Sequence, residues 1–453
     1  MIEYRSLAAK IHIRDVILFS LALHLLAIGF PSDGGKIFDE NFYVPAANDL
    51  LNGHPSNPEH PFLGKLWGSI GIAIFGNNWF GWRIPMVAFG MLTLYVFYHL
   101  AKIFLDERKA LLATAFLSFD TIFFIHSSIL LLEIPALFFG ILGFYLYLKD
   151  RYMLSAASFA LALLSKEWSV LFLIALLAYH LMVKKPWSRK DVKVPRRIAV
   201  QTAKFIGVLI VVVFVPLWIY ASAYQPPTSA EVQVKVTQFV DQQGNIVRNS
   251  TSTTTVSKGQ ILNPIEQLKY IVTYQSKLTI KPDSKITFWN NYAWGWIIPY
   301  DSDPPLYYQN TVRKESVTKA GEVIIKKEVT EKHPVNWRGT GNFPIWLAIW
   351  PIIPFAIINI IRKKPPNKLD LLIIAWIIGT YLPWFYVSGV MGRIVYAFYF
   401  INVVPILALA IPYFIGTISK GSIKAEWIIA SIWFAAAVIF FFAYYPVGVF
   451  DYG

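Results

Sequence analysis

Residues 38–43 read FDENFY and, after an interval rich in Pro, Asn and Gly, residues 60–65 read HPFLGK. Both pieces follow the first long apolar run, residues 13–31, so a carboxylate pair, a His and a Lys lie against a membrane surface. Ionisable groups near bilayer hydrocarbon cost about 3 kcal/mol each unless they are paired or functional. Their clustering therefore indicates a functional site, although acids that merely cap a short helix would give the same pattern.

The overall composition is that of a polytopic membrane protein. Of the 453 residues, 56% are hydrophobic and only 15% are charged, and the mean hydropathy is +0.49. A net charge of +14 would suggest a nucleic-acid partner in a soluble chain, but the basic residues lie mostly in short loops between apolar runs. We therefore expect membrane lipids as partners and no nucleic acid. The chain has no Cys, which excludes disulfides and thiolate metal sites.

Apolar runs long enough to cross a bilayer, at about 20 residues per crossing, predict an all-α bundle of about eleven transmembrane helices. Lys and Arg collect in loops such as those at 102–109, 184–204 and 362–364, which the positive-inside rule places in the cytoplasm. The polar segment between the seventh and eighth runs then lies outside. The eleven runs lie at residues 13–31, 82–105, 110–126, 128–148, 152–165, 167–183, 203–221, 343–361, 369–388, 393–416 and 426–445.

This topology divides the chain into three parts. Residues 1–221 are expected to form an N-terminal transmembrane module, which contains a first outer loop at 32–81. Residues 222–342 are expected to form an extracytoplasmic domain, and residues 343–453 a C-terminal transmembrane module.

The outer segment has the pattern of a small α+β domain. Residues 231–237 alternate with period two before a Gly-containing turn and a Thr-rich return, which predicts a β-hairpin, and residues 322–329 predict another strand. An amphipathic stretch at 261–278 predicts a helix, either lying in the membrane interface or packed on its neighbours.

Charged residues gather on the outer side of the expected bundle. Acidic residues within the spans lean to that side, with Asp120 in the outer half of the third span and Glu133 in the outer third of the fourth. Mixed charge on one face predicts a cavity that opens to the outside. The basic residues that break the positive-inside pattern all lie at the outer ends of spans: Lys65, Arg83, Lys166 and Arg393.

Short motifs occur in order along almost the whole chain: Asp39-Glu40, His60-Pro61-x-Leu63-Gly64-Lys65, Arg83-Ile84-Pro85, Ser127-x-x-x-x-Leu132-Glu133, Ser165-Lys166-x-Trp168, Gly341-Asn342-x-Pro344, Tyr381-Leu382-Pro383-Trp384 and Gly392-Arg393. This ordered set resembles the protein O-mannosyltransferases. The resemblance implies a GT-C fold. It also implies transfer of mannose, or another hexose, from a polyprenyl- or dolichyl-phosphate donor to Ser or Thr of secreted or membrane proteins, with inversion.

The resemblance also implies roles for the charged residues. Asp39 is the expected general base for the acceptor hydroxyl, and Glu40 is expected to orient or help bind the substrate. Lys65 and Arg83 are expected to neutralise the leaving phosphate. The other expected substrate contacts, of which the last two are further candidates for the phosphate, are His60, Glu133, Lys166 and Arg393.

No metal ion and no cofactor are expected, because the lipid-linked sugar is itself a substrate. The triplet Asp301-Ser302-Asp303 resembles the Asp-x-Asp of metal-dependent sugar transferases, but two prolines follow it and the sequence is more typical of a turn.

Several positions depart from the family pattern, which allows a different sugar or acceptor preference. Phe62 stands where the family has the second Pro of His-Pro-Pro, and Ser128 stands where Arg is common. Glu133 replaces an Asp. A His pair common after the arginine near the tenth span is also missing, with Phe398 and Tyr399 in that neighbourhood.

Two other functions are left open by the sequence. A GT-C transferase that glycosylates a lipid or a cell-envelope glycan would use the same charged cavity. A polyprenyl-lipid flippase or transporter would need charged groups that continue toward the inner leaflet, where these spans are nearly bare of acid. For the transferase we expect the plasma membrane of a prokaryote, in particular an archaeon, with the active site on the extracytoplasmic side and a dimer as one candidate assembly.

Overall fold

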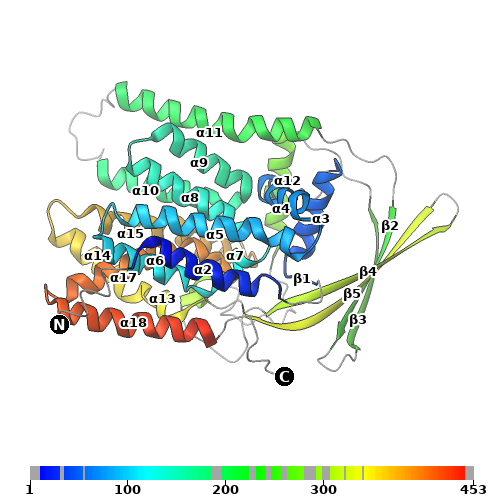
Figure 1. The fold of residues 1–453 in the computed structure, drawn as a ribbon. Helices are drawn as coiled ribbons and strands as arrows, with labels where there is room; N and C mark the ends of the chain where they lie inside the picture. Colours follow the sequence, from blue (N-terminus) through cyan, green and yellow to red (C-terminus); the bar gives the residue numbers. More distant parts are fainter. Residues whose placement is uncertain are drawn as a thin grey trace.

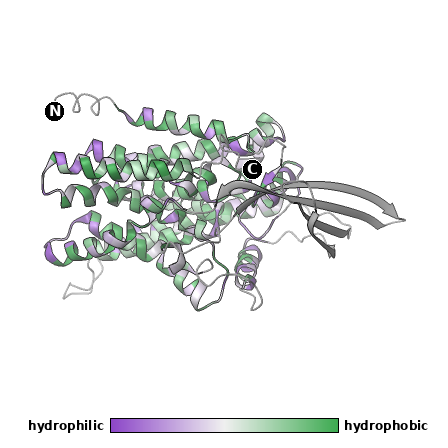
Figure 2. Cartoon of the chain, turned by 90° about the horizontal axis from the view of Figure 1, so that it is seen from below, coloured by the Kyte–Doolittle hydropathy of each residue, from purple (hydrophilic) through white to green (hydrophobic). Residues whose placement is uncertain are grey.

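The computed structural model describes residues 11–30, 35–54, 57–184, 196–223, 231–240, 246–256, 263–279, 292–297, 307–320, 323–338 and 341–443. Its helices form one bundle, and its long strands project from one end of that bundle (Figure 1). Hydrophobic residues cover much of the bundle helices, whereas hydrophilic residues are concentrated toward helix ends and connections (Figure 2). This distribution is expected of a helical bundle that lies in a membrane.

The first half of the chain contributes the first outer loop and much of the bundle. Asn78, Asp106 and Asp120 begin α5, α6 and α7, because each side chain accepts a hydrogen bond from a main-chain N–H of the first turn. The elements are α2 (Ile13–Ala27), β1 (Lys36–Ile37), α3 (Glu40–Leu51), α4 (Leu63–Phe75), α5 (Trp79–Ala101), α6 (Glu107–Ser118), α7 (Thr121–Ser128), α8 (Glu133–Leu148), α9 (Tyr152–Ser165), η1 (Glu167–Ser169), α10 (Val170–Lys184) and α11 (Arg196–Ala223).

The second half begins with the outer segment and returns to the bundle. The outer elements are β2 (Glu231–Val240), β3 (Ile246–Val256), α12 (Pro264–Lys277), η3 (Ala293–Ile297), β4 (Tyr307–Ala320) and β5 (Val323–Arg338). The bundle is completed by α13 (Phe343–Trp346), α14 (Ile349–Arg362), α15 (Lys368–Thr380), α16 (Leu382–Gly389), η4 (Ala397–Asn402), α17 (Val404–Ile418) and α18 (Ile423–Ala443).

Each of the eleven predicted apolar runs contains a helix. Within the described residues, six helical segments are long and apolar enough to cross a membrane, or seven if the pair α6 and α7, bent by 65°, counts as one span. Four further apolar helices, α4, α8, α9 and α17, are shorter. The chain is therefore an integral membrane protein, while the count of eleven crossings stays a prediction.

The strands form one five-stranded sheet in the order β1-β4-β5-β2-β3. The predicted hairpin is confirmed, because β2 pairs with β3 antiparallel from Glu231↔Val256 to Val240↔Ile246. The predicted strand at 322–329 and helix at 261–278 are also confirmed, as β5 and α12. The sequence did not predict β1, whose two residues pair with Thr311 and Asn310 of β4 and join the first outer loop to this sheet.

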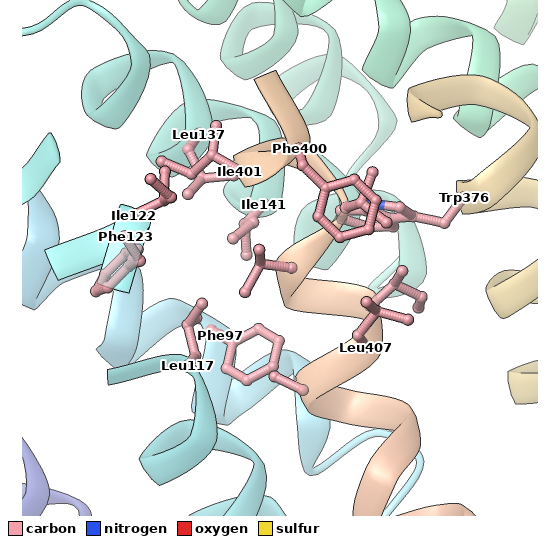
Figure 3. Packing of buried hydrophobic residues seen from close by; sticks show 14 of the residues in the cluster. Phe97, Leu117, Ile122, Phe123, Leu137, Ile141, Trp376, Phe400, Ile401 and Leu407 are labelled. Carbon is pink, nitrogen blue, oxygen red and sulfur yellow. The ribbon is translucent and has the colours of Figure 1, made fainter. Parts of the chain in front are cut away.

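The interior of the bundle is packed with large apolar side chains from both halves of the chain. Phe97 of α5, Ile141 of α8, Trp376 of α15 and Leu407 of α17 are buried in one cluster (Figure 3). The peripheral helix α11 instead leaves side chains such as Trp218 more than half exposed. Exposed apolar surface of this kind is suited to contact with lipid.

Candidate active site

Asp39 lies at the start of α3, one residue after the short strand β1 and Phe38. Phe38 has a left-handed backbone (φ 52°), which allows the chain to turn from the strand into the helix. Asn41 supports this turn by donating from Nδ2 to the Phe38 carbonyl at 2.8 Å. Asp39 is thereby placed at the surface of the loop, where its side chain is partly exposed.

The carboxylate of Asp39 has an unusual electrostatic environment. The Tyr43 hydroxyl donates to its Oδ2 over a long 3.4 Å hydrogen bond. Burial raises the pKa of Asp39 to about 6, because desolvation outweighs the opposing effect of the Lys166 charge. A carboxyl group with this pKa can accept a proton near neutral pH, as the predicted general base must.

The neighbouring Glu40 points into the protein and forms a buried ion pair with Arg83. Both side chains are 0% exposed, and the distances are 2.8 Å from Arg83 Nε to Oε1 and 2.7 Å from Nη2 to Oε2. The main-chain N–H groups of Ile37 and Leu130 also donate to this carboxylate, each at 2.9 Å. Glu40 therefore ties the first outer loop to α5 and to the chain before α8.

Arg83 is almost fully engaged in this arrangement. Its Nη1 donates to the carbonyls of Ile28 and Phe30, at 2.8 and 2.9 Å. Together with the two bonds to Glu40, these contacts use four of the five guanidinium N–H groups. A buried pair with satisfied partners suits a structural role, and the predicted contacts of both residues with the substrates stay predictions.

Lys166 and Glu133 form a second ion pair beside Asp39. Lys166 Nζ lies 3.0 Å from Glu133 Oε1 and donates to the Tyr43 hydroxyl at 3.2 Å. The other oxygen of Glu133 lies 3.7 Å from Nδ1 of the buried His126. Tyr43, which the sequence did not single out, thus lies between a cation and the candidate base.

His60 belongs to a third contact, with a carboxylate that the sequence analysis missed. Its Nδ1 lies 2.9 Å from Oε2 of Glu167, and its ring meets the Tyr43 ring edge-on at 5.7 Å. Burial lowers the pKa of His60, although Glu167 opposes this shift. Glu167 is the variable position of the motif Ser165-Lys166-x-Trp168. Its place between two motif residues was the feature of the sequence that could have identified it as a site residue.

Lys65 is buried at the start of α4 and holds the preceding loop. Its Nζ donates to the carbonyls of His60, at 2.9 Å, and of Asn57. Burial lowers the pKa of Lys65 to about 7. The adjacent Gly64 permits close packing, because a Cβ there would lie 2.7 Å from both Leu132 Cδ2 and the Ser165 carbonyl.

Arg393 approaches the same region from the C-terminal half. Its Nε donates to the main-chain carbonyl of Gln275 at 3.2 Å, and its Nη2 donates to the Gln275 side-chain oxygen. Nη1 donates to the Ile394 carbonyl at 2.9 Å. The guanidinium carbon lies 4.8 Å from the ring centre of Trp168 and 5.7 Å from that of Tyr399. Three of its five N–H groups are accounted for in this way.

Asp120 and Asn342 help hold the bundle together instead of forming part of this cluster. Asp120 accepts a hydrogen bond from Nε1 of Trp346 at 2.8 Å. Asn342 donates to the carbonyls of Phe119 and Ala437, at 2.9 and 2.8 Å. Asp120 is therefore a buried structural acceptor, which corrects its predicted place in an outer cavity. The triplet 301–303 lies outside the described residues.

The contacts join residues from distant parts of the sequence into one network, which we call the active-site cluster. It offers a partly exposed candidate base, Asp39, whose carboxylate is coupled electrostatically to the cation Lys166, and it contains a second cation, Arg393. A base beside positive charge is the combination that a transfer from a phosphate leaving group requires. The cluster consists of Asp39, Tyr43, His60, Glu133, Lys166, Glu167, Gln275 and Arg393.

Comparison with known proteins gives consistent results. The sequence profile of the family described as dolichyl-phosphate-mannose-protein mannosyltransferase matches residues 59–220. A polyprenol-phosphate-mannose–protein mannosyltransferase of Mycolicibacterium smegmatis is 22% identical over 87% of this chain and 79% of its own length. The protein of the same name from Mycobacterium tuberculosis is 23% identical over 89% of this chain and 80% of its own length.

The fold also matches a solved structure. The S. cerevisiae protein O-mannosyltransferase Pmt1-Pmt2 complex bound to the sugar donor superposes with a TM-score of 0.66, at 11% identity, over 96% of this chain and 89% of the matched chain. The bundle is therefore a GT-C fold, as the resemblance implied. The family profile and the mycobacterial relatives point the same way: in sequence, the chain is similar to protein O-mannosyltransferases.

Proposed function

We propose that this protein transfers mannose from a polyprenyl-phosphate donor to Ser or Thr hydroxyls of secreted or membrane proteins. The observation that carries the proposal is the position of Asp39: partly exposed, with a pKa raised to about 6, and electrostatically coupled to Lys166. The names of the relatives supply the substrates, since each is a polyprenol-phosphate-mannose–protein mannosyltransferase.

The proposed reaction uses the groups of the active-site cluster directly. The Asp39 carboxylate takes the proton of the acceptor hydroxyl while the hydroxyl oxygen bonds to the anomeric carbon of mannose. The bond from that carbon to the phosphate oxygen breaks, and polyprenyl phosphate leaves. Attack opposite the leaving group inverts the configuration at the anomeric carbon.

Arg393 is the proposed ligand of the leaving phosphate, in place of Arg83. Arg393 has two N–H groups beyond its three bonds within the described structure, whereas Arg83 has one. Charge-assisted donors of this kind stabilise a phosphate that gains charge in the transition state. The reaction so described requires no metal ion and no cofactor.

The bacterial relatives support a prokaryotic membrane as the proposed location, and the distribution of basic residues supports the proposed orientation. We place the protein in the plasma membrane of a prokaryote, an archaeon in particular, with Asp39 and the outer sheet on the extracytoplasmic side. A dimer is one candidate assembly, and the oligomeric state remains to be measured.

The test is transfer by the purified full chain. Wild-type protein is incubated with polyprenyl-phosphate mannose and Ser/Thr-containing peptides, and mass spectrometry detects the added hexose. Asp39→Asn keeps the size and polarity of the side chain but removes the proton acceptor, so turnover should fall about 10²- to 10⁴-fold while donor binding persists. Asp49→Asn, the same change at another partly exposed position of α3, is the matched control and should retain activity.

Two results would contradict the proposal. Asp39→Asn protein that binds donor and transfers mannose at the wild-type rate would remove Asp39 as the base. If wild-type protein modifies a lipid or glycan acceptor but no peptide, the proposed acceptor class is wrong.

A further inference from the structure

Gln275 contacts both ends of the active-site cluster from the outer segment. It lies in the last turn of α12 and is only 7% exposed, on the same buried face as Gln267 and Ile271. Its side-chain oxygen accepts from Arg393 Nη2, and its Nε2 donates to Glu167 Oε1 at 3.0 Å. One neutral amide therefore bridges a cation and an anion.

The backbone reinforces this junction. The Gln275 carbonyl accepts from Arg393 Nε, and the Leu278 carbonyl accepts from the Ile394 N–H at 2.8 Å. Thr279 and Arg393 also form an isolated antiparallel bridge. The end of α12 and the segment that carries Arg393 are thus fixed to one another, although they are more than a hundred residues apart in sequence.

The partners of the basic residues differ in charge. Arg83 is paired with Glu40, and Lys166 is paired with Glu133. Within the described part of the chain, no carboxylate oxygen lies within 4.0 Å of the Arg393 guanidinium, and its side-chain acceptor is the uncharged amide of Gln275. Among the described residues, Arg393 is therefore oriented without being neutralised.

We propose that Gln275 is a positioning residue that orients Arg393 for the donor phosphate while leaving its positive charge uncompensated. This inference rests on the proposed function, because the anion is the phosphate of the polyprenyl donor. A Glu at position 275 would hold the guanidinium equally well but would cancel its charge. It would also place a second carboxylate beside Glu167.

The experiment compares variants of the full chain in detergent or nanodiscs. The measurements are the Kd for polyprenyl phosphate without sugar, the donor KM, the acceptor KM, kcat and the Tm. Gln275→Glu should raise the Kd and the donor KM about 10-fold or more, because a charged hydrogen bond to the phosphate is weakened, and should leave the acceptor KM near the wild-type value. Met has a similar length but no hydrogen-bonding amide, so Gln275→Met should also raise the Kd and the donor KM. This second variant tests the inference if Gln275→Glu does not fold.

Two controls separate positioning from general stability. Ser276→Ala alters the next residue, which is exposed and bonds only to the Thr273 carbonyl of its own helix at 2.8 Å among the contacts described, and should match wild type. Adding Glu167→Gln to Gln275→Glu removes the carboxylate repulsion but not the neutralisation of Arg393. Donor affinity should therefore remain weak in the double variant.

The results distinguish this inference from the proposed function. Wild-type donor Kd and KM in both Gln275→Glu and Gln275→Met would overturn the inference, as would full recovery of donor affinity on adding Glu167→Gln. Wild-type protein that binds polyprenyl phosphate but transfers no mannose would overturn the proposed function, and the binding measurements would still test Gln275.

Discussion

Removing Glu40 alone should destabilise the protein far more than removing Asp39, the carboxylate next to it. Glu40→Met would leave the Arg83 guanidinium buried without its charged partner, together with the N–H groups of Ile37 and Leu130. Breaking a buried ion pair by removing one partner costs about 3–5 kcal/mol. At about 1.4 kcal/mol per factor of ten, the equilibrium between folded and unfolded protein should shift by about 100- to 4,000-fold.

The double variant Glu40→Met/Arg83→Met tests the origin of this loss. It removes both charges and replaces them with apolar side chains, so it should be more stable than Glu40→Met. Thermal and denaturant unfolding of the purified proteins measure these differences, and Asp39→Asn should unfold close to wild type. Two results would refute the structural role of the pair. One is a Glu40→Met protein as stable as wild type. The other is a double variant whose loss of unfolding free energy equals the sum of the losses in Glu40→Met and Arg83→Met.

Two further predictions concern pH and topology. Because the pKa of Asp39 is about 6 and the base must be deprotonated, kcat/KM should rise with pH through about 6. Tyr43→Phe removes a hydrogen bond to the Asp39 carboxylate, so this rise in kcat/KM should move to higher pH. A pH profile that does not move would exclude an effect of Tyr43 on Asp39. In this Cys-free chain, a membrane-impermeant thiol reagent should label Asn52→Cys from the outer side and Arg108→Cys from the cytoplasmic side only, and the reverse pattern would invert the proposed orientation.

Charge placement allowed much of the site to be predicted. Asp39, Lys166 and Arg393 each stand at the boundary between an apolar run and a loop, and the positive-inside rule assigns those boundaries to one side. Their convergence follows from topology, because outer ends of adjacent spans meet at one face. The resemblance to a known family added the role of Asp39 as a base.

The pairing of these residues could not be predicted in the same way. Glu40 and Asp39 are adjacent in sequence, yet one is buried against Arg83 and the other is partly exposed, because successive side chains of a helix point in different directions. Gln275 meets Arg393 across 118 residues. The periodicity of a single sequence predicts local secondary structure, not a side-chain contact between residues so far apart.

Secondary structure was predictable where the pattern was long enough. The alternation over 231–237 predicted the β2–β3 hairpin, whereas the two residues of β1 are too few to show a period. The third apolar run, residues 110–126, was expected to be one span. The chain instead bends by 65° between α6 and α7, where the Asp120 carboxylate accepts from the Phe123 N–H and begins α7.

The near-equality of opposite charges has a consequence for how the donor arrives and the product departs. In and beside the active-site cluster, the described cationic and anionic side chains are nearly balanced: Lys65, Arg83, Lys166 and Arg393 against Asp39, Glu40, Glu59, Glu133 and Glu167. A balanced set produces only a weak field at a distance, so anionic lipids in the surrounding leaflet are not drawn in by charge alone. Under the proposed function, recognition of the donor would then depend on short-range contacts at Arg393, and the released polyprenyl phosphate would leave without having to escape strong attraction from the described charges.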